Sequence, residues 1–294
     1  MPLSEKEFQR RCDDLITNRD ALGWSALLEV VSPHGIPGVL SHKQACQLAF
    51  DRAFLSTLDW EHSVDPNMSL QKFKLSPLEG YFIQMMDACL AGGANVDSFI
   101  DQLTPLTRAS QSGLIDLVRY LIEKGADLNP EPFVSNKQFT VVPSPLTSAL
   151  IEHHDEVAFL LIEKGADIEA CDEEDNTPLA WAVKTGRTQV RNHLLEKGAY
   201  LHTVNAHNQN LLHNCLLSLE EYSTETGVET LSWLARLGVD PHQENWNGLS
   251  ALAMAQDTEE CFISAINGGL AQRAADQLDK QTPASPASLQ RSRL

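Results

Sequence analysis

Basic residues are scarce in this sequence. Its 294 residues include 22 lysines and arginines against 40 aspartates and glutamates, which gives a net charge of −18. Nucleic acids and anionic lipids would be repelled by such a charge, so neither is expected as the main ligand. The excess of carboxylates favours a basic partner, or serves solubility alone.

Long apolar runs and clustered cysteines are missing as well. Apolar stretches such as residues 157–162 fall far short of the ~20 residues of a membrane helix, and the first residues form no apolar segment of a signal peptide. The six cysteines include no C-x-x-C pair, so neither a disulfide framework nor a zinc site is indicated. We therefore expect a soluble protein of the reducing cytoplasm, without a membrane partner or a metal.

What the chain contains instead is a repeat. A Ser/Thr-Pro-Leu mark occurs four times, and two degenerate versions follow it. The six begin at Ser76, Thr104, Ser144, Thr177, Asn210 and Ser250. A second mark, a glycine followed by a small and then a polar residue, begins at Gly93, Gly125, Gly165, Gly198 and Gly238. The first mark precedes the glycine by 21 residues in three units, and the glycine precedes the next mark by 12 residues three times, so the period is 33.

Each period predicts two helices. Ser or Thr can cap the first helix, and Pro in its first turn costs no hydrogen bond. The fourth mark predicts such a helix over residues 178–184. The second helix carries an apolar stripe, such as Leu117, Val118 and Leu121, and ends at a glycine that tolerates positive φ. One such pair cannot bury its apolar face alone, so neighbouring pairs should stack.

A period of 33 residues with this mark is typical of ankyrin repeats, and residues from about 70 to 270 resemble the ankyrin-repeat family. The match is specific for the units starting near 101, 141, 174 and 207, and weaker for those near 73 and 247. The resemblance implies an all-α fold, an ankyrin-repeat solenoid of helix–turn–helix–hairpin units, whose usual activity is binding other proteins.

Three segments follow from this organisation. We expect residues 1–70 to form a helical N-terminal cap, in which Ser4 starts a capping-box spacing and residues 33–38 break the helices. Residues 71–270 form the array. Residues 271–294, rich in Gln, Ser and Pro, are expected to form a flexible tail.

Two insertions of seven residues interrupt the period. Segment 129–143 contains three prolines, which prevent a helix, together with Phe133 and Phe139. The second insertion is predicted to lengthen the loop between two helices over residues 218–227. Insertions in repeats usually map to loops, often on a binding face, but neutral drift in surface loops explains them equally well.

Catalytic motifs are not found. The chain has no G-x-S-x-G and no Gly-rich phosphate loop. His202, His207 and His213 with Cys215 could be drawn as a metal cluster, but the resemblance gives His213 a backbone hydrogen bond and Cys215 a small buried position. The carboxylates around Cys171 should disfavour its thiolate. We expect no enzymatic activity, no cofactor and no metal.

The resemblance places ligands along the concave face, which the hairpin tips and the first helices form. Carried over position by position, it nominates a set of partner-binding residues: Asp101, Leu103, Gln111, Ser112, Val141, Ile151, Glu152, Glu173, Glu174, Asn176, Lys184, Thr185, His207, Gln209, Trp246 and Asn247, with Phe133 and Phe139 of the first insertion. Trp246 is the expected anchor, because a tryptophan on a turn has no obvious core role and tryptophan is enriched in binding hot spots. Trp181, inside a helix, is assigned to packing.

Charge gives a further indication. Residues 152–175 contain ten acidic residues and one lysine, a net charge of −9. They form either a solvated acidic face or an electrostatic footprint for a basic protein.

The sequence thus predicts a non-enzymatic interaction protein, expected as a monomer, that holds a basic protein partner. It could act as an inhibitor, such as a bacterial immunity protein that neutralises a toxin. The alternative is an adaptor or secreted effector that bridges cellular proteins and uses its tail as a second docking element.

Overall fold

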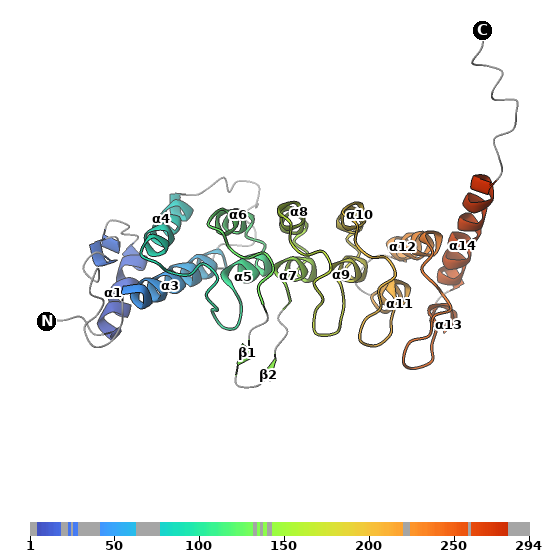
Figure 1. Ribbon diagram of the computed structural model, residues 1–294, viewed down its shortest axis with the longest axis horizontal. Coiled ribbons are helices and arrows are strands. Elements are labelled where there is room, and N and C mark those ends of the chain that lie inside the picture. The colour runs from blue at the N-terminus through green and yellow to red at the C-terminus, as the bar shows by residue number, and fades with distance from the viewer. Residues whose placement is uncertain are drawn as a thin grey trace, which may run out of the picture. The chain divides into compact units, whose positions relative to one another are not determined.

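The computed structural model describes residues 5–18, 23–24, 26–28, 42–62, 77–131, 134–135, 138–139, 143–219, 224–257 and 260–281. Among them the regular elements are helices and one pair of very short strands (Figure 1). The chain forms two compact units, Met1–Glu152 and His153–Leu294. The all-α prediction is confirmed. The predicted cap boundary at residue 70, the capping residue Ser4 and the break at 33–38 lie outside the described residues.

The described residues at the N-terminal end of the first unit are helical. The helices of this end are α1 (Glu5–Asn18), α3 (His42–His62) and α4 (Pro77–Ala91). Phe8 of α1 and Phe50 and Phe54 of α3 are fully buried and supply its core. Arg52 of α3 donates two hydrogen bonds to the Asp13 carboxylate of α1, at 2.7 and 2.6 Å. Apolar burial therefore holds these helices together, and an ion pair spans their contact.

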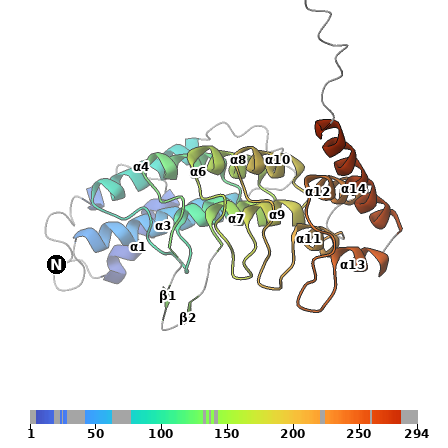
Figure 2. The ribbon, with the colours of Figure 1, turned by 45° about the vertical axis from the view of Figure 1, so that its right-hand side comes forward.

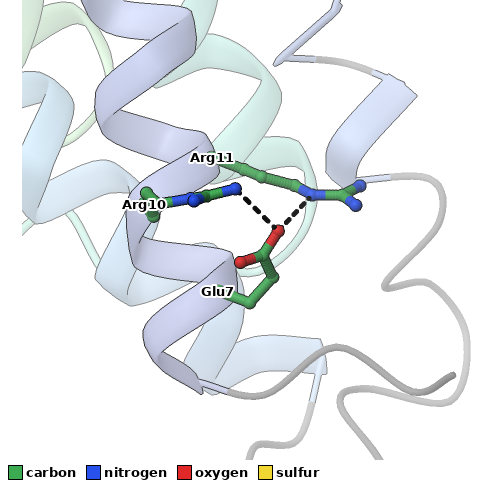
Figure 3. A network of polar contacts seen from close by, with 3 residues as sticks. All are labelled: Glu7, Arg10 and Arg11. Carbon is green, nitrogen blue, oxygen red and sulfur yellow. Dashed lines mark hydrogen bonds and ion pairs between the residues drawn. The ribbon is translucent and has the colours of Figure 1, made fainter.

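A second group of charges lies on the surface of α1. Glu7 accepts hydrogen bonds from Arg11 at 3.3 Å and Arg10 at 3.5 Å, one turn along the same helix (Figure 3). Exposed pairs at this spacing contribute only a few tenths of a kcal/mol, ~0.3–0.5. They support the helix without determining the fold.

Helix α4 departs from the predicted repeat. The first mark, at residues 76–78, opens one helix of 15 residues instead of a pair of helices. This helix runs to the Gly93 mark and packs against α3. The unit near 73 therefore supplies one helix of its own, which explains its short spacing of 17 residues from mark to glycine.

The remaining helices of the first unit follow the repeat rule. They are α5 (Pro105–Gln111), α6 (Ile115–Glu123) and α7 (Pro145–Ile151). The hydroxyls of Thr104 and Ser144 cap α5 and α7, because each accepts the backbone N–H three residues ahead, at 3.2 and 3.1 Å. Leu106 and Leu146, the leucines of the marks, are fully buried.

The second unit contains three and a half periods. Its helices are α8 (Asp155–Lys164), α9 (Pro178–Lys184), α10 (Thr188–Glu196), α11 (Leu211–Leu217), α12 (Thr224–Leu237), α13 (Ala251–Asp257) and α14 (Glu260–Gln281). Helices α8 and α10 lie side by side in one row, and α9 and α11 lie side by side in a second row. The long loops that lead from the first row to the second all extend toward one side (Figures 1 and 2). The predicted helix at 178–184 is confirmed to the residue.

Positive φ occurs where the sequence predicts it. Gly125, Gly165 and Gly198 end their helices with φ of 86°, 91° and 98°. His153 takes the place of the turn glycine between two helices and adopts φ of 65°. Histidine tolerates this conformation at modest cost.

The two insertions form different structures. In the first, β1 (Val134–Ser135) pairs antiparallel with β2 (Gln138–Phe139), and Val134 lies opposite Phe139. None of the described residues of this insertion is helical, in agreement with the three prolines. In the second, the predicted loop 218–227 is wrong in part, because residues 224–227 are the first turn of α12. Glu225 lies in that turn, where a negative charge favours the helix dipole.

The predicted tail boundary at residue 271 is also wrong, because α14 continues to Gln281. The added turns are stabilised by contacts with α12: Asp276 accepts a hydrogen bond from Arg236 at 3.0 Å. A Cβ atom on Gly269 would lie 2.1 Å from the Ser232 carbonyl oxygen, so the two helices approach closely at this glycine. Residues 282–294 lie outside the described residues.

Replacing Leu161 by alanine should lower the free energy of unfolding by about 2–5 kcal/mol, because this fully buried side chain of α8 would leave a cavity. Leu217→Ala is the matched control, since that leucine is 55% exposed, and it should change stability by less than about 0.5 kcal/mol. Urea unfolding followed by circular dichroism measures both. Equal costs would contradict the burial pattern.

The adjacent glycines of α14 allow a sharper test of packing, because the same substitution should change stability in opposite directions at the two positions. Gly268→Ala should stabilise the protein by up to about 1 kcal/mol through helix propensity, because its Cβ meets nothing within 4 Å. Gly269→Ala should destabilise it by about 1–3 kcal/mol, because its Cβ would collide with the backbone of α12. Thermal unfolding of the two variants would show opposite shifts. Two shifts of the same sign would mean that α14 does not pack closely on α12.

Candidate interaction surface

Three hairpins of the second unit, residues 165–177, 198–210 and 238–250, share one turn. In each, a side-chain oxygen accepts the backbone N–H groups two and four residues ahead, at 2.9–3.1 Å. The three acceptors are Asp172, Asn205 and Asn245. The residue three positions after each acceptor has positive φ: Asp175 at 59°, Asn208 at 58° and Gly248 at 73°. Asx turns of this kind fix the loop backbone by local hydrogen bonds, so the tips are rigid.

The tips are also joined to one another. The Ala206 N–H donates to the Glu174 carbonyl at 2.8 Å, and the Trp246 N–H donates to the His207 carbonyl at 3.1 Å. The Asn208 side-chain amide reaches the Glu244 carbonyl at 2.7 Å. These bonds run across the hairpins, so exposed side chains on the three tips keep fixed positions relative to one another.

His213 anchors the last hairpin to α11. Its Nε2 lies 3.1 Å from the Leu249 carbonyl oxygen, and its Nδ1 lies 3.3 Å from the Asn210 N–H at the start of α11. Because a carbonyl can only accept, Nε2 carries the proton. The predicted backbone role of His213 is confirmed, and the bond holds the hairpin that carries Trp246.

Trp246 is the most exposed large apolar side chain of these hairpins, at 75%. Its ring meets the ring of His207 edge to face, with the centroids 6.2 Å apart and an angle of 81° between the planes. His207 is itself exposed, and Asn247 beside Trp246 is exposed too. An aromatic side chain held on a rigid turn and left in water is the kind of group that partners bury.

Charge on the hairpins has one sign. The three segments contain eight carboxylates and no lysine or arginine. Glu173, Glu174 and Asp175 are exposed on the first tip. Solvent-exposed charges of one sign steer oppositely charged molecules toward a surface.

The structure brings together most of the residues nominated in the second unit. Glu173, Glu174, His207, Trp246 and Asn247 are exposed on the tips, while Lys184 at the end of α9 and Gln209 are half-buried. We call these seven residues the hairpin surface.

Two nominated residues do not belong to it. Asn176 is 0% exposed, and its amide donates to Asp172 while its oxygen accepts from Asn205 at 3.1 Å. Thr185 is 7% exposed and donates its hydroxyl to the Trp181 carbonyl at 2.8 Å. Both side chains stabilise the scaffold, because their polar atoms are used inside it.

The nominated residues of the first unit lie on its own hairpin and helix ends. Asp101, Gln111 and Glu152 are exposed, whereas Leu103, Ser112 and Ile151 are half-buried. Phe139 lies in β2, and Phe133 and Val141 lie outside the described residues.

The two most exposed apolar side chains outside the nominated set are those of Leu217 and Tyr200. Leu217 ends α11 and is 55% exposed; it lies 33 residues after Lys184 and 66 after Ile151, so the period itself could have nominated it. Tyr200 is 71% exposed and stands where three other units carry an aspartate. That departure from the repeat was the available signal.

In the part of the chain that the structure describes, no group of three or more His, Cys, Asp and Glu side chains could hold a metal ion. Partial burial, and then the neighbouring carboxylates, raise the pKa of the Cys171 thiol above its ordinary value, as the sequence predicts. Within the described ranges no helix is long and apolar enough to cross a bilayer.

Comparison with known families identifies the repeats. Residues 134–213 match a model of three ankyrin repeats, and residues 101–131 match a single ankyrin repeat. A crystal structure of an ankyrin repeat domain from Acinetobacter baumannii matches 65% of this chain and 92% of its own, with a TM-score of 0.53 and 20% identity. At that identity the likeness shows the fold alone.

Similar proteins are otherwise much longer than the region they share. The chain is 28% identical over 146 residues to transient receptor potential cation channel subfamily A member 1 of Drosophila melanogaster, covering 49% of this chain and 12% of that protein. It is 33% identical over 103 residues to ankyrin repeat and KH domain-containing protein 1 of Homo sapiens, covering 31% of this chain and 4% of that protein. A putative ankyrin repeat protein of fowlpox virus is 28% identical over 146 residues, 42% of this chain and 33% of its own.

The anchoring of the last hairpin should depend on pH. Burial lowers the pKa of the His213 imidazole below its ordinary value of 6.5, although the bond to Leu249 acts in the opposite direction. Below pH 6.5 the unfolded chain therefore binds the proton more readily, and stability falls as the pH drops through that value toward the lowered pKa.

Urea unfolding at about pH 7.5 and about pH 5.5 measures this contribution. His213→Gln should reduce the pH dependence, whereas the control His202→Gln, at an exposed position, should leave it unchanged. An identical pH dependence in the wild type and His213→Gln would show that His213 does not contribute.

Proposed function

We propose, from the premise that this chain is an ankyrin-repeat protein, that it binds another protein through the hairpin surface and has no catalytic activity of its own. Ankyrin repeats are generally interaction domains, and their ligands are typically proteins. The observation that carries the proposal is the 75% exposure of Trp246 on a fixed tip. Hydrogen bonds within its own turn and one to the neighbouring hairpin hold that tip. A preorganised anchor loses little conformational entropy on binding.

The partner we propose is basic. The three hairpins carry eight carboxylates and no lysine or arginine. Such a surface would attract a positively charged partner and speed its association. Lys184 is the one cation of the hairpin surface itself. A basic patch on the partner would meet Glu173 and Glu174 on the first hairpin, while Trp246 on the third hairpin supplies the apolar anchor.

The role we propose is inhibition inside the cytoplasm by a monomer. Many basic surfaces bind nucleic acid, so covering such a surface with carboxylates would block it. A bacterial immunity protein that neutralises a basic toxin, such as a nuclease, would act in this way.

The alternative is an adaptor or effector that bridges two proteins. The β1–β2 ribbon favours it, because this ribbon belongs to the other compact unit and offers a second separate element. Deleting residues 282–294 addresses the proposed docking role of the tail, since α14 remains whole. An inhibitor should keep its affinity for its partner, whereas an adaptor that uses the tail should lose one of two partners.

Charge reversal tests the acidic surface. Glu173→Lys with Glu174→Lys should weaken binding of a basic partner at least tenfold at low salt and less at high salt, because exposed charges are screened. Glu196→Lys with Glu229→Lys makes the same change in charge at exposed positions of α10 and α12 and serves as the control. Trp246→Ala should cost more than about 2 kcal/mol of binding free energy at any salt concentration.

The partner itself can be captured from lysate with the wild type and the three variants as parallel baits, followed by mass spectrometry. A genuine partner is recovered by the wild type and the control variant and lost by the two surface variants. Recovery of general chaperones alone, or a partner held equally by all four baits, would refute the proposed surface.

A further inference from the structure

The one cation of the hairpin surface already lies on an aromatic face. The Lys184 ammonium lies 4.2 Å from the centroid of the Trp181 ring, well inside the ~6 Å range of cation–π contacts. Both residues belong to α9, three positions apart, and both are half-buried. Helical neighbours at this spacing project from the same face.

The first hairpin of the second unit holds that ring in place. The Trp181 indole N–H donates to Asp172 Oδ2 at 2.7 Å. The other oxygen of Asp172 accepts the N–H groups that shape the turn. The ring orientation is therefore tied to the acidic tip, and the carboxylate at the ring edge adds to the negative potential that a cation meets.

We propose that the face of Trp181 is a receptor for a basic side chain of the partner, and that Lys184 occupies it in the free protein. This inference rests on the proposed function, because it takes the partner to be basic. Arginine is the favoured guest, since its planar guanidinium stacks on aromatic rings better than an ammonium. The chain itself contains such a stack, with the Arg191 guanidinium carbon 3.9 Å from the Trp233 ring centroid.

Lys184 can leave the ring at little cost. Its side chain is a flexible four-carbon stem that is only half-buried, so the ammonium can turn toward water when it leaves the ring. A partner arginine presented by a folded surface would replace it, and Glu173 and Glu174 could then pair with the displaced lysine or with the rest of the partner's basic patch. The lysine acts as a competitor within the surface.

A purely structural role for Lys184 makes a different prediction. Lys184 is the last residue of α9, where a positive charge interacts favourably with the helix dipole. In that case, removing the charge would lower stability slightly and would affect a basic ligand only through the overall charge.

The test uses a fluorescently labelled hexa-arginine peptide as the probe and the full chain as the receptor, with anisotropy measured at low salt. Lys184→Met should bind the probe about two- to fivefold tighter than Lys164→Met, the range that a cation–π contact of ~0.5–1 kcal/mol gives. Lys164 lies at the exposed end of α8, so its loss changes the net charge equally without touching the ring. Equal affinities of the two variants, or weaker binding by Lys184→Met, would overturn the inference.

A second variant tests whether the tighter probe binding depends on the Trp181 ring. Trp181→Phe combined with Lys184→Met should lose most of the extra affinity, because phenylalanine binds cations more weakly than tryptophan; thermal unfolding checks that this protein is folded. A gain that survives the change to phenylalanine counts against the ring.

The proposed function and the Trp181 site can be tested separately. If Glu173→Lys with Glu174→Lys abolishes probe binding while Lys184→Met and Lys164→Met remain equal, the basic partner stands and only the Trp181 site falls. If the probe does not bind the wild type or any variant, both are refuted.

Discussion

Burial of the leucine in four of the repeat marks is the constraint on which the other features depend. Leu106, Leu146, Leu179 and Leu212 are all fully buried. The helices that carry them have seven residues each, and helices of that length are not stable alone in water. Each pair must therefore pack against a neighbour, and this packing sets the spacing of the hairpins. In the second unit, Leu179 and Leu212 are one period of 33 residues apart, and the hairpin tips that precede them follow the same period.

Local rules account for what the sequence predicts well. Short-range chemistry determines the bounds of α9, the caps at Thr104 and Ser144 and the positive φ of Gly165: a hydroxyl before proline, or a glycine at the end of a helix. Long-range contacts account for what it misses. The single helix α4, the first turn of α12 and the last turns of α14 depend on neighbouring surfaces, and composition alone favoured a flexible tail where Asp276 in fact pairs with Arg236.

The hairpin surface likewise contains residues that the sequence predicts correctly and residues whose contacts it does not predict. Trp246 could be predicted as exposed because it stands on a repeated turn without an apolar neighbour in the pattern. Asn176 and Thr185 occupy positions that the family resemblance marks as accessible, but their polar atoms bond within the scaffold. Leu217 was within reach of the sequence through the period of 33. The contact of Lys184 with Trp181 was not, because the indole is oriented by Asp172, nine residues earlier.

The start of α12 carries a consequence for how such chains change length. Helices α8 and α10 begin ten residues before their terminal glycines, whereas α12 begins fourteen before Gly238. Four residues are close to one turn of about 3.6, so the lengthened helix keeps its angular phase, and the same side of the cylinder still meets the core. Residues added ahead of the packed part of α12 leave the phase of the residues that follow unchanged, so insertions can accumulate at this end, whereas two residues inserted within the helix would turn the rest of the apolar stripe away from the core.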